Sequence, residues 1–495
     1  MSKQFLLAID QGTSSSRTVI YDHSASPVAS AQQEFVQLYP QPGWVEHDPE
    51  AIWQSVQAVT RQAMQDAAAT AGDITAIGIT NQRETTLIWD RDTGQCIYNA
   101  IVWQDRRTAA QCDRLKADGI ESSVIEKTGL RLDPYFSATK IAWILENVPA
   151  ARERAAAGKL AFGTVDCFLL WRLTAGRVHA TDATNASRTL LFNIHTQAWD
   201  AGLLRLFDIQ EALLPDVRDC TAEFGVTDAA TFGGAVPILG MAGDQQAALI
   251  GQAGFDEGTT KSTYGTWCFV IGNTGSEALV SKNKLLTTVA SRIDGRVSYG
   301  LEGSVFVAGS ALQWLRDELH IIDSAQQSED IARARGIVED VHVVPAFAGL
   351  GAPYWDAHAR GAILGLTRGS GRDEIVTATL QAIAFQTRDL VDAMADDGIA
   401  PSIIRVDGGM VANNWFLQFL ADILGVAVER PANVESTVLG AAYLAGLTSG
   451  VISSIEKISG LWQRDALFEP DMTSERREQL LAGWATAVAR VKASD

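Results

Sequence analysis

The chain has 495 residues, which is too long for one hydrophobic core, so two domains are expected and three are the alternative. Its 47% hydrophobic and 20% charged residues are typical of a soluble globular protein and argue against disorder or a coiled coil. The 40 basic and 59 acidic side chains give a formal charge of −19, which disfavours general affinity for nucleic acid or anionic membranes.

The cysteines and the apolar runs indicate a reduced, cytoplasmic protein. Five cysteines are scattered along the chain without any Cys-x-x-Cys spacing, so neither a disulfide framework nor a zinc site is expected. The first apolar run, Phe5 to Ile9, ends at an acid and is too short for a signal peptide core. No later run is long enough to predict a membrane span.

The first half of the chain alternates between strands and helices. The run Phe5 to Ile9, a stretch of small residues and the alternating run Arg17 to Tyr21 predict strand, turn and strand. A third strand is expected over Val28 to Gln32. An amphipathic helix follows, with these residues at steps of three or four on one face: Trp53, Val56, Val59, Ala63 and Ala67. A buried strand, Ile74 to Thr80, comes next.

The second half repeats this opening near residue 260. A strand over Thr259 to Thr263, a turn at Tyr264-Gly265-Thr266 and a strand over Trp267 to Ile271 are expected. Further helices are expected over Glu374 to Asp397 and Asn413 to Leu424, with the strand Ile403 to Val406 between them. Ser370 and Asp373 supply a capping pattern for the first of these helices, and Gly398 can end it. The repetition predicts two α/β lobes around a cleft, residues 1–250 and 251–495.

The segment Asp10 to Arg17 is the first candidate site. A turn of Gly12 and small hydroxyl residues offers backbone N–H groups and hydroxyls to a terminal phosphate, without a bulky side chain in the way. The carboxylate of Asp10 suits a hydrated Mg²⁺. The alternative is an ordinary solvated turn, because Gly, Ser and Thr are common in turns.

Two further clusters carry candidate chemistry. Asp244, followed by two glutamines, opens a helix after a strand over Val236 to Leu239, and it is expected in the cleft; the alternative is an N-cap aspartate. Arg83 and Glu84, with Tyr135, can share a polyol because Arg donates to hydroxyl oxygens while the carboxylate accepts their protons. A surface ion pair is the alternative for the Arg83–Glu84 pair.

Several common signatures are missing from the sequence. There is no P-loop, no strand-linked Gly-x-Gly-x-x-Gly, no metal-ligand spacing among the seven histidines and no Gly-x-Ser-x-Gly. Asp407-Gly408-Gly409 gives only a weak nucleotide signal. Trp103, Trp143 and Phe269 are expected in the core unless they line the cleft.

Three segments resemble the FGGY carbohydrate kinase family: Asp10 to Arg17, Gly78 to Thr85 and Ala242 to Leu249. Two long family patterns are also present, one in Tyr135 to Ile144 and the other in Gly361 to Leu366 followed by Glu374-Ile375 and Thr379 to Gln381. The similarity extends through Val343 to Arg368 and Arg405 to Asn414, and it weakens only towards the C-terminus.

The resemblance implies two actin-like (ribonuclease H-like) α/β ATPase domains flanking a central cleft, the first for glycerol and phosphate and the second for nucleotide. It implies phosphorylation of glycerol by ATP to sn-glycerol 3-phosphate, with Mg²⁺. Arg83 and Glu84 with Trp103 and Tyr135 favour glycerol over xylulose, gluconate or ribulose. A kinase of a related polyol or of dihydroxyacetone is the alternative, and a nucleotide-gated chaperone or filament protein shares the fold.

The resemblance also assigns roles to single residues. Asp10 and Asp244 organise Mg²⁺, and Asp244 is the base. The acceptor is held by Arg83, Glu84, Tyr135, Asp244 and Gln245 and covered by Trp103 and Phe269. The terminal phosphate meets Thr13, Ser14 and Ser15 with Arg17 nearby, and the nucleotide meets Thr266, Gly309, Gln313, Gly409 and Asn413. Family members are commonly homodimers or homotetramers.

Two departures from the family pattern stand out. Trp267 occupies a position that is usually glycine, directly after Thr266. The loop Thr231 to Pro237 has the glycines of a fructose 1,6-bisphosphate site but no cation, and no Lys or Arg occurs from Cys220 to Thr260. A doubly phosphorylated sugar needs charge partners, so weak or absent inhibition by this ligand is expected.

Overall fold

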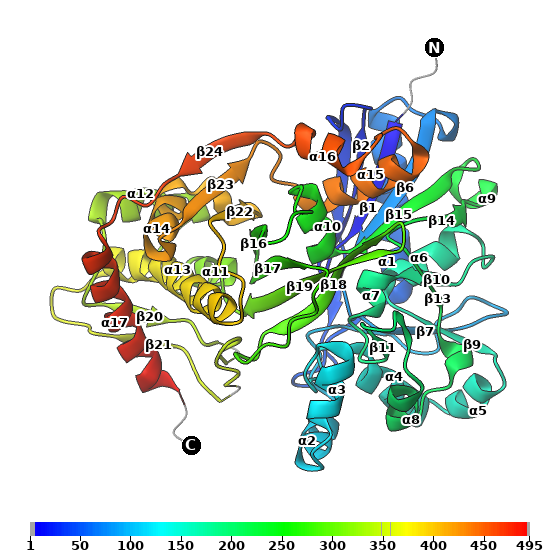
Figure 1. Cartoon of the computed structure of the whole chain (residues 1–495), viewed down its shortest axis with the longest axis horizontal. Helices are drawn as coiled ribbons and strands as arrows, with labels where there is room; N and C mark the ends of the chain where they lie inside the picture. The colour runs from blue at the N-terminus through cyan, green and yellow to red at the C-terminus, as the bar shows by residue number, and fades with distance from the viewer. Residues whose placement is uncertain (1–4, 348, 357, 493–495) are drawn as a thin grey trace.

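The computed structural model describes residues 5–347, 349–356 and 358–492 and has two α/β lobes, each built on one large sheet (Figure 1). We call the part around the six-stranded sheet the first lobe and the part around the seven-stranded sheet the second lobe. In spatial order, the first sheet consists of β14 (Thr221–Val226), β15 (Pro237–Gly243), β6 (Ile74–Asn81), β1 (Phe5–Gln11), β2 (Ser15–Tyr21) and β3 (Pro27–Glu34).

The three central strands of the first sheet, β15, β6 and β1, run parallel. Asp10 of β1 lies beside Thr80 of β6, and Thr80 lies beside Ala242 of β15. Because the carboxyl ends of parallel strands meet at one edge of a sheet, the segments that follow these strands are brought together there. That edge therefore collects Asp10 and the segments containing Arg83 and Asp244.

The second sheet repeats the plan of the first. In order it consists of β18 (Leu286–Ile293), β19 (Arg296–Val305), β17 (Cys268–Gly275), β16 (Thr260–Tyr264), β22 (Ile403–Asp407), β23 (Ala427–Pro431) and β24 (Arg464–Phe468). In both lobes an antiparallel hairpin, β1–β2 or β16–β17, is followed by two strands parallel to its first member. The predicted repetition is thus confirmed in the strand order.

Helices bury both faces of the first sheet. Along β1, Leu7 and Ile9 pack with residues of α1 (Pro49–Asp66) and α6 (Val165–Leu173), whereas Leu6 and Ala8 pack with α10 (Asp244–Gly251) and α15 (Ser436–Ser449). Successive side chains of a strand point to opposite faces, so a strand covered on both sides is apolar throughout. This accounts for the uninterrupted apolar run at the start of the chain.

Helix α15 belongs to the second half of the chain but packs on the first sheet, beside β1, β6 and β15 (Figure 1). Glycines allow the close approach. A Cβ on Gly78 of β6 would lie 2.0 Å from the carbonyl oxygen of Ala441, and one on Gly440 would lie 1.8 Å from that of Ala247 in α10. The polypeptide therefore returns to the first lobe after it has built most of the second.

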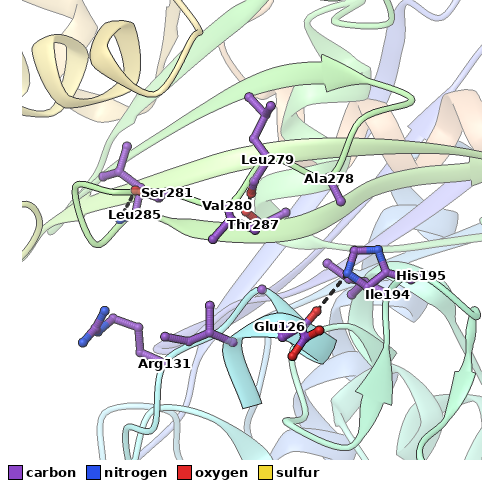
Figure 2. Close-up of a pocket in the computed structure, with 12 residues that line it drawn as sticks. Glu126, Arg131, Ile194, His195, Ala278, Leu279, Val280, Ser281, Leu285 and Thr287 are labelled. Atoms are coloured by element: carbon purple, nitrogen blue, oxygen red, sulfur yellow. Dashed lines mark hydrogen bonds between the residues drawn. The ribbon is translucent and has the colours of Figure 1, made fainter. Parts of the chain in front are cut away.

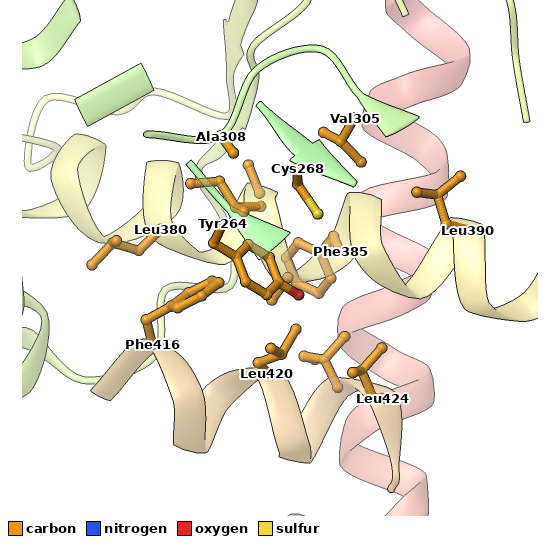
Figure 3. Packing of buried hydrophobic residues seen from close by; sticks show 14 of the residues in the cluster. Tyr264, Cys268, Val305, Ala308, Leu380, Phe385, Leu390, Phe416, Leu420 and Leu424 are labelled. Carbon is orange, nitrogen blue, oxygen red and sulfur yellow. The ribbon is translucent and has the colours of Figure 1, made fainter. Parts of the chain in front are cut away.

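The core of the second lobe packs α13 (Arg372–Asp396) and α14 (Asn414–Leu424) against the sheet (Figure 3). Tyr264, at the end of β16, is fully buried there. Its ring meets Phe416 edge-on at 5.1 Å, and its hydroxyl donates to Thr387 at 3.2 Å. This packing fixes the backbone immediately before the turn at Gly265 and Thr266.

The capping pattern predicted for α13 is wrong in its residues. Gly371 is the N-cap, and the carboxylate of Glu374 accepts from its N–H at 2.8 Å, while the hydroxyl of Ser370 accepts from Thr367. The longer Glu side chain reaches back over the first turn, which Asp373 does not do. The predicted end is confirmed, because Gly398 follows the C-cap residue Asp397 with φ +106°.

The remaining elements are shorter or peripheral. The helices are α2 (Ala109–Ala117), α3 (Glu121–Thr128), α4 (Ser137–Asn147), α5 (Ala151–Ala156), α7 (Ala183–Ala186), α8 (Ala201–Phe207), α9 (Ala229–Phe232), α11 (Gly309–Asp317), α12 (Ala325–Arg335), α16 (Ile455–Leu461) and α17 (Ser474–Val491). The strands are β4 (Gln37–Leu38), β5 (Glu46–His47), β7 (Leu87–Asp90), β8 (Ala100–Ile101), β9 (Leu160–Gly163), β10 (Ala180–Asp182), β11 (Phe192–Asn193), β12 (Ala198–Trp199), β13 (Asp216–Arg218), β20 (His342–Val344) and β21 (Ala362–Leu364). Among the described helices, none combines the length and apolarity needed to cross a bilayer.

Candidate active site

Two carboxylates lie at the carboxyl edge of the first sheet. Burial, and then the charge of Asp244, raise the pKa of Asp10 to about 7, although Arg17 opposes the shift. Burial also raises the pKa of Asp244, against the opposing effect of Arg83. Gly243 is the N-cap of α10 and Asp244 is its first residue, so the N-cap alternative for Asp244 is wrong. The charge of Asp244 therefore disfavours ionisation of Asp10, and Asp244 itself accepts from the backbone N–H of Gln245 at 2.7 Å.

Arg83 and Glu84 are buried, with side chains only 2% exposed, so the surface ion pair alternative is wrong. The Nε of Arg83 lies 3.0 Å from Oδ1 of Asp244. Gly243 makes room for this contact, because a Cβ there would lie 2.8 Å from Cγ and Cδ of Arg83. Glu84 has φ +61°, an unfavourable backbone conformation for a residue with a side chain, which is typical of functional sites.

Two residues that the sequence analysis missed complete this cluster. Arg83 donates through Nη1 and Nη2 to the two oxygens of Glu302 at 2.6 and 3.2 Å. Arg188 donates from Nε to Glu84 at 2.6 Å and from Nη2 to Glu302 at 2.8 Å. We call these four residues, Arg83, Glu84, Arg188 and Glu302, the ionic network. Glu302 stands in the buried part of strand β19, where a charge demands a buried partner.

The pKa values of the two acids of the ionic network are shifted in opposite directions. Burial raises the pKa of Glu84 even though Arg188 and Arg83 pull it down. Burial also works against ionisation of Glu302, but Arg188 and Arg83 together outweigh it and lower the pKa of that carboxyl. Glu302 is therefore the more firmly ionised of the two acids.

The β1–β2 hairpin carries the predicted phosphate residues next to this edge. The Nε1 of Trp103 donates to the hydroxyl of Thr13 at 2.9 Å, and the hydroxyl of Ser15 accepts from Gln32 at 2.9 Å. Ser14 is exposed at the turn. Arg17 is turned towards Gln32 and forms an ion pair with Glu435, which directly precedes α15.

Aromatic rings from both lobes meet beside Arg83. Trp103 makes edge-on contacts with Tyr135 at 5.6 Å, with Phe269 at 6.4 Å and with Trp267 at 4.7 Å, and Trp267 stacks on Phe269. The guanidinium of Arg83 lies 5.9 Å from the Phe269 ring. Trp143 is elsewhere, packed on Trp44 and Tyr98.

Gln245, the residue after Asp244, also receives a contact from the second lobe. The buried Nζ of Lys261 on β16 donates to its side-chain oxygen at 2.6 Å and to the hydroxyl of Thr263. Burial lowers the pKa of Lys261, while Asp407 and Asp244 oppose that shift. Side chains of the second lobe thus reach two predicted acceptor residues, Arg83 and Gln245.

All five predicted nucleotide residues line one pocket of about 370 Å³ in the second lobe: Thr266, Gly309, Gln313, Gly409 and Asn413. Asn413 caps α14 by accepting from the N–H of Phe416 at 2.8 Å. Its buried side-chain N–H₂ group has no hydrogen-bond partner among the described residues. Unpaired buried donors are costly, so this group is available to a ligand.

A second pocket lies between α3 of the first lobe and the segment before β18 (Figure 2). It holds only about 20 Å³, which is room for about one water. His195 contacts the backbone oxygen of Glu126 at 2.9 Å there, and no predicted site residue lines it. It is a gap in the contact between the lobes and carries no site.

Comparison with known proteins follows the same division. The N-terminal domain of the FGGY family of carbohydrate kinases matches residues 5–251, and the C-terminal domain matches residues 260–449. The chain belongs to this family. Glycerol kinase 1 of Pseudomonas aeruginosa is 61% identical over 488 residues, and glycerol kinase of Ectopseudomonas mendocina is 62% identical over 493 residues, each alignment covering 99% of both chains.

Two solved structures have the same fold as this chain. The glycerol kinase of Plasmodium falciparum with ADP is 37% identical, with a TM-score of 0.93, and the match covers 100% of this chain and 99% of that one. The gluconate kinase of Lactobacillus acidophilus reaches a TM-score of 0.88 at 23% identity, over 99% of each chain. The chain therefore has the two-domain α/β fold of the FGGY kinases.

The two departures from the FGGY pattern have distinct surroundings. Trp267 is accommodated by stacking on Phe269 and packing against Phe306 at 4.9 Å. The loop after α9 carries no cation of its own, although Arg61 of α1 lines a pocket together with Thr231 and Phe232. Weak inhibition by fructose 1,6-bisphosphate stays a prediction.

Proposed function

We propose that this chain transfers the γ-phosphoryl group of ATP to a terminal hydroxyl of glycerol, giving sn-glycerol 3-phosphate and ADP. The observation that carries the proposal is the direct contact between a buried cation, Arg83, and a candidate base, Asp244, at the edge that also holds the β1–β2 hairpin. Whole-chain identity of 61% and 62% to proteins named glycerol kinase supports the same substrate.

In this proposal the acceptor is recognised by charged and aromatic side chains. Arg83 donates to hydroxyl oxygens of glycerol, and Glu84 and Gln245 accept from its O–H groups. Oε1 of Glu84 is already taken by Arg188, whereas Oε2 has no hydrogen-bond partner among the residues described. Trp103, Tyr135 and Phe269 cover the carbon backbone of the acceptor. A deoxy analogue would leave buried polar groups unpaired and would be rejected.

Asp244 accepts the proton during transfer. The attacking hydroxyl oxygen forms a bond to the γ-phosphorus while the bond from that phosphorus to the bridging oxygen of ADP breaks. The hydroxyl proton goes to the Asp244 carboxylate. A pKa raised by burial brings this acid closer to the working pH, which suits a general base.

Asp10 and Asp244 fit a magnesium ion. The charge of Asp244 raises the pKa of Asp10, and a divalent cation would relieve this repulsion, since Mg²⁺ prefers one or two carboxylates with waters and phosphate oxygens. Within the described residues no cluster of three or more His, Cys, Asp or Glu side chains could hold a metal by itself. The ion would be held by these two carboxylates and would neutralise charge on the phosphates of ATP.

The nucleotide binds, in this proposal, along the pocket of the second lobe with its phosphates towards the β1–β2 hairpin. Thr13, Ser14 and Ser15 then donate to the terminal phosphate. Gly309 and Gly409 let the nucleotide approach the backbone closely, and the free N–H₂ of Asn413 donates to it.

The test is ADP release with a panel of acceptors. Glycerol should stimulate ADP release strongly, whereas 1,2-propanediol, xylulose and gluconate should not. If dihydroxyacetone or another polyol stimulated ADP release more than glycerol did, that compound would be assigned as the substrate in place of glycerol. ADP release that ignores every acceptor would favour the nucleotide-gated chaperone or filament alternative.

We further propose that the protein acts in the cytoplasm as a homodimer or homotetramer. This rests on the family, whose members commonly assemble in this way. Sedimentation of the purified protein at working concentration tests it, and a monomer would contradict it.

A further inference from the structure

We propose that Glu302 of the second lobe is a positioning residue, which holds Arg83 of the first lobe in the orientation that binds the acceptor. The inference rests on the proposed function, because it assigns Arg83 to glycerol. It adds a residue from the other lobe to the acceptor site, with a role that is distinct from contact with the substrate.

The geometry fixes one guanidinium from two sides. Glu302 receives Nη1 and Nη2 of Arg83 in a two-pronged contact, at 2.6 and 3.2 Å, and Asp244 lies 3.0 Å from Nε. Arg has a planar fork that matches a carboxylate in this way, which sets the plane of the group as well as its position. Without Glu302 the long Arg83 side chain would keep Asp244 and a 3.3 Å contact to Gln246, with Glu84 and the Phe269 ring farther away at 3.9 and 5.9 Å.

The charges explain why an acid is required at this place. Arg83 and Arg188 both donate to Oε1 of Glu302, so two buried cations share one carboxylate. A buried charge without a partner is strongly unfavourable. Glu84 is bonded to Arg188 and lies 3.9 Å from Nε of Arg83, so it does not replace Glu302 as the direct partner of Arg83.

The contact also joins the two lobes at the acceptor residues. Glu302 stands on β19, paired with Ile271 of β17, and its side chain crosses to a residue that follows β6 of the first lobe. The lobes also meet through other side chains, such as Lys261, whose Nζ donates to Gln245 at 2.6 Å, and through backbone groups, as where the N–H of Thr287 donates to Gly129 at 2.9 Å. A backbone contact of that kind holds the lobes together but orients no acceptor side chain.

Glu302→Gln is the main test, with Glu302→Asp as the charge-conserving variant. The matched control is Glu46→Gln, which changes an acid that is also buried and paired with an Arg, at 2.7 Å to Arg107, within the first lobe. Steady-state kinetics on folded protein give the KM for glycerol, the KM for ATP and kcat. Calorimetric titration with glycerol alone gives the Kd.

For Glu302→Gln we expect the glycerol KM and Kd to rise by about 10- to 100-fold, because misplacing a positioning group can cost that much. The KM for ATP should stay within about twofold of wild type, since the contact is to the acceptor side. Glu302→Asp should recover part of the glycerol affinity, and Glu46→Gln should lower the melting temperature without changing either KM.

A glycerol KM in Glu302→Gln within about twofold of that in Glu46→Gln would overturn the inference. Equal increases in the KM values for glycerol and ATP would overturn it too, because a general loosening of the fold would then explain both changes. Failure of the proposed function would be distinguishable from failure of this inference, because glycerol would then not stimulate ADP release by the wild-type protein.

Discussion

The acceptor site and the nucleotide pocket differ in the charge and burial of the residues that form them. At the acceptor site, Arg83, Glu84, Arg188 and Glu302 are buried charges, each held by at least one other member of the ionic network. In the nucleotide pocket, Thr266, Gln313 and Gly409 are exposed, and three of the lining residues are glycines. The first site depends on a few strong contacts, and the second on a shape to which many groups contribute.

This difference has an energetic consequence. Removing one partner of a buried ion pair leaves an uncompensated charge, whereas removing one exposed hydrogen bond costs little. Single substitutions at the acceptor site should therefore change catalysis far more than those in the nucleotide pocket. Four substitutions, in decreasing order of expected effect, test this contrast.

Asp244→Asn should lower kcat by roughly 10²- to 10⁴-fold, the usual contribution of a positioned general base. The amide keeps the shape of the side chain but cannot take the hydroxyl proton. Single-turnover measurements of glycerol 3-phosphate formation at saturating ATP and glycerol provide the check. Near-normal turnover in this variant would show that Asp244 is not the general base.

Arg83→Ala should raise the KM for glycerol by about 10²-fold or more, because the acceptor loses its main donor and Asp244 and Glu302 lose a shared cation. The KM for ATP should change little. Arg107→Ala, which removes another buried first-lobe Arg, serves as the control for folding. Unchanged glycerol affinity in Arg83→Ala would contradict the expectation that the acceptor site depends on a few strong contacts.

Asp10→Asn should stabilise the fold, by less free energy than the two preceding kinetic effects represent. The pKa of Asp10 is about 7 in the folded protein, against 3.8 for the unperturbed acid, so the folded state holds a proton that the unfolded state releases between those values. Stability contributed by this proton is lost as the pH rises through that window. Asn avoids the loss, so the variant should gain about 2 kcal/mol at about pH 8.5 and less at about pH 5.5. Chemical denaturation at the two pH values measures the gain, and a smaller gain at the higher pH would contradict the expectation.

Gln313→Ala should have the smallest effect. Its side chain is exposed at the rim of the nucleotide pocket, so we expect the KM for ATP to rise by about two- to tenfold and the KM for glycerol to stay unchanged. ADP release at varied ATP concentration measures it. An effect as large as that of Arg83→Ala would mean that the pocket, too, relies on single strong contacts.

Much of the fold could be predicted from local patterns. The apolar run at Phe5 to Ile9 forms most of β1, and the predicted strand Ile74 to Thr80 differs from β6 only by Asn81. The helix predicted over Glu374 to Asp397 is α13 to within two residues at its start and one at its end. Periodicity and glycines carry such information because strands and helices are set by neighbours in the chain.

The site could be predicted only in part. The structure groups Asp10, Arg83 and Asp244 as the sequence suggested, because Asp10 lies near the end of one strand and Arg83 and Asp244 follow two other strands of the same parallel set. Arg188 and Glu302 could not be placed, since they lie 104 residues from Glu84 and 219 residues from Arg83. Such contacts depend on how the lobes pack, which no local pattern records.

The path of α15 bears on any attempt to divide the protein into pieces. A cut near residue 250 would follow the two family domains but would remove α15 from the sheet that contains Leu6 and Ala8. That apolar surface would then face water in an isolated N-terminal fragment and would promote aggregation. Fragments 1–250 and 251–495 should therefore be recovered as a folded pair when produced together, and the first should be insoluble when produced alone.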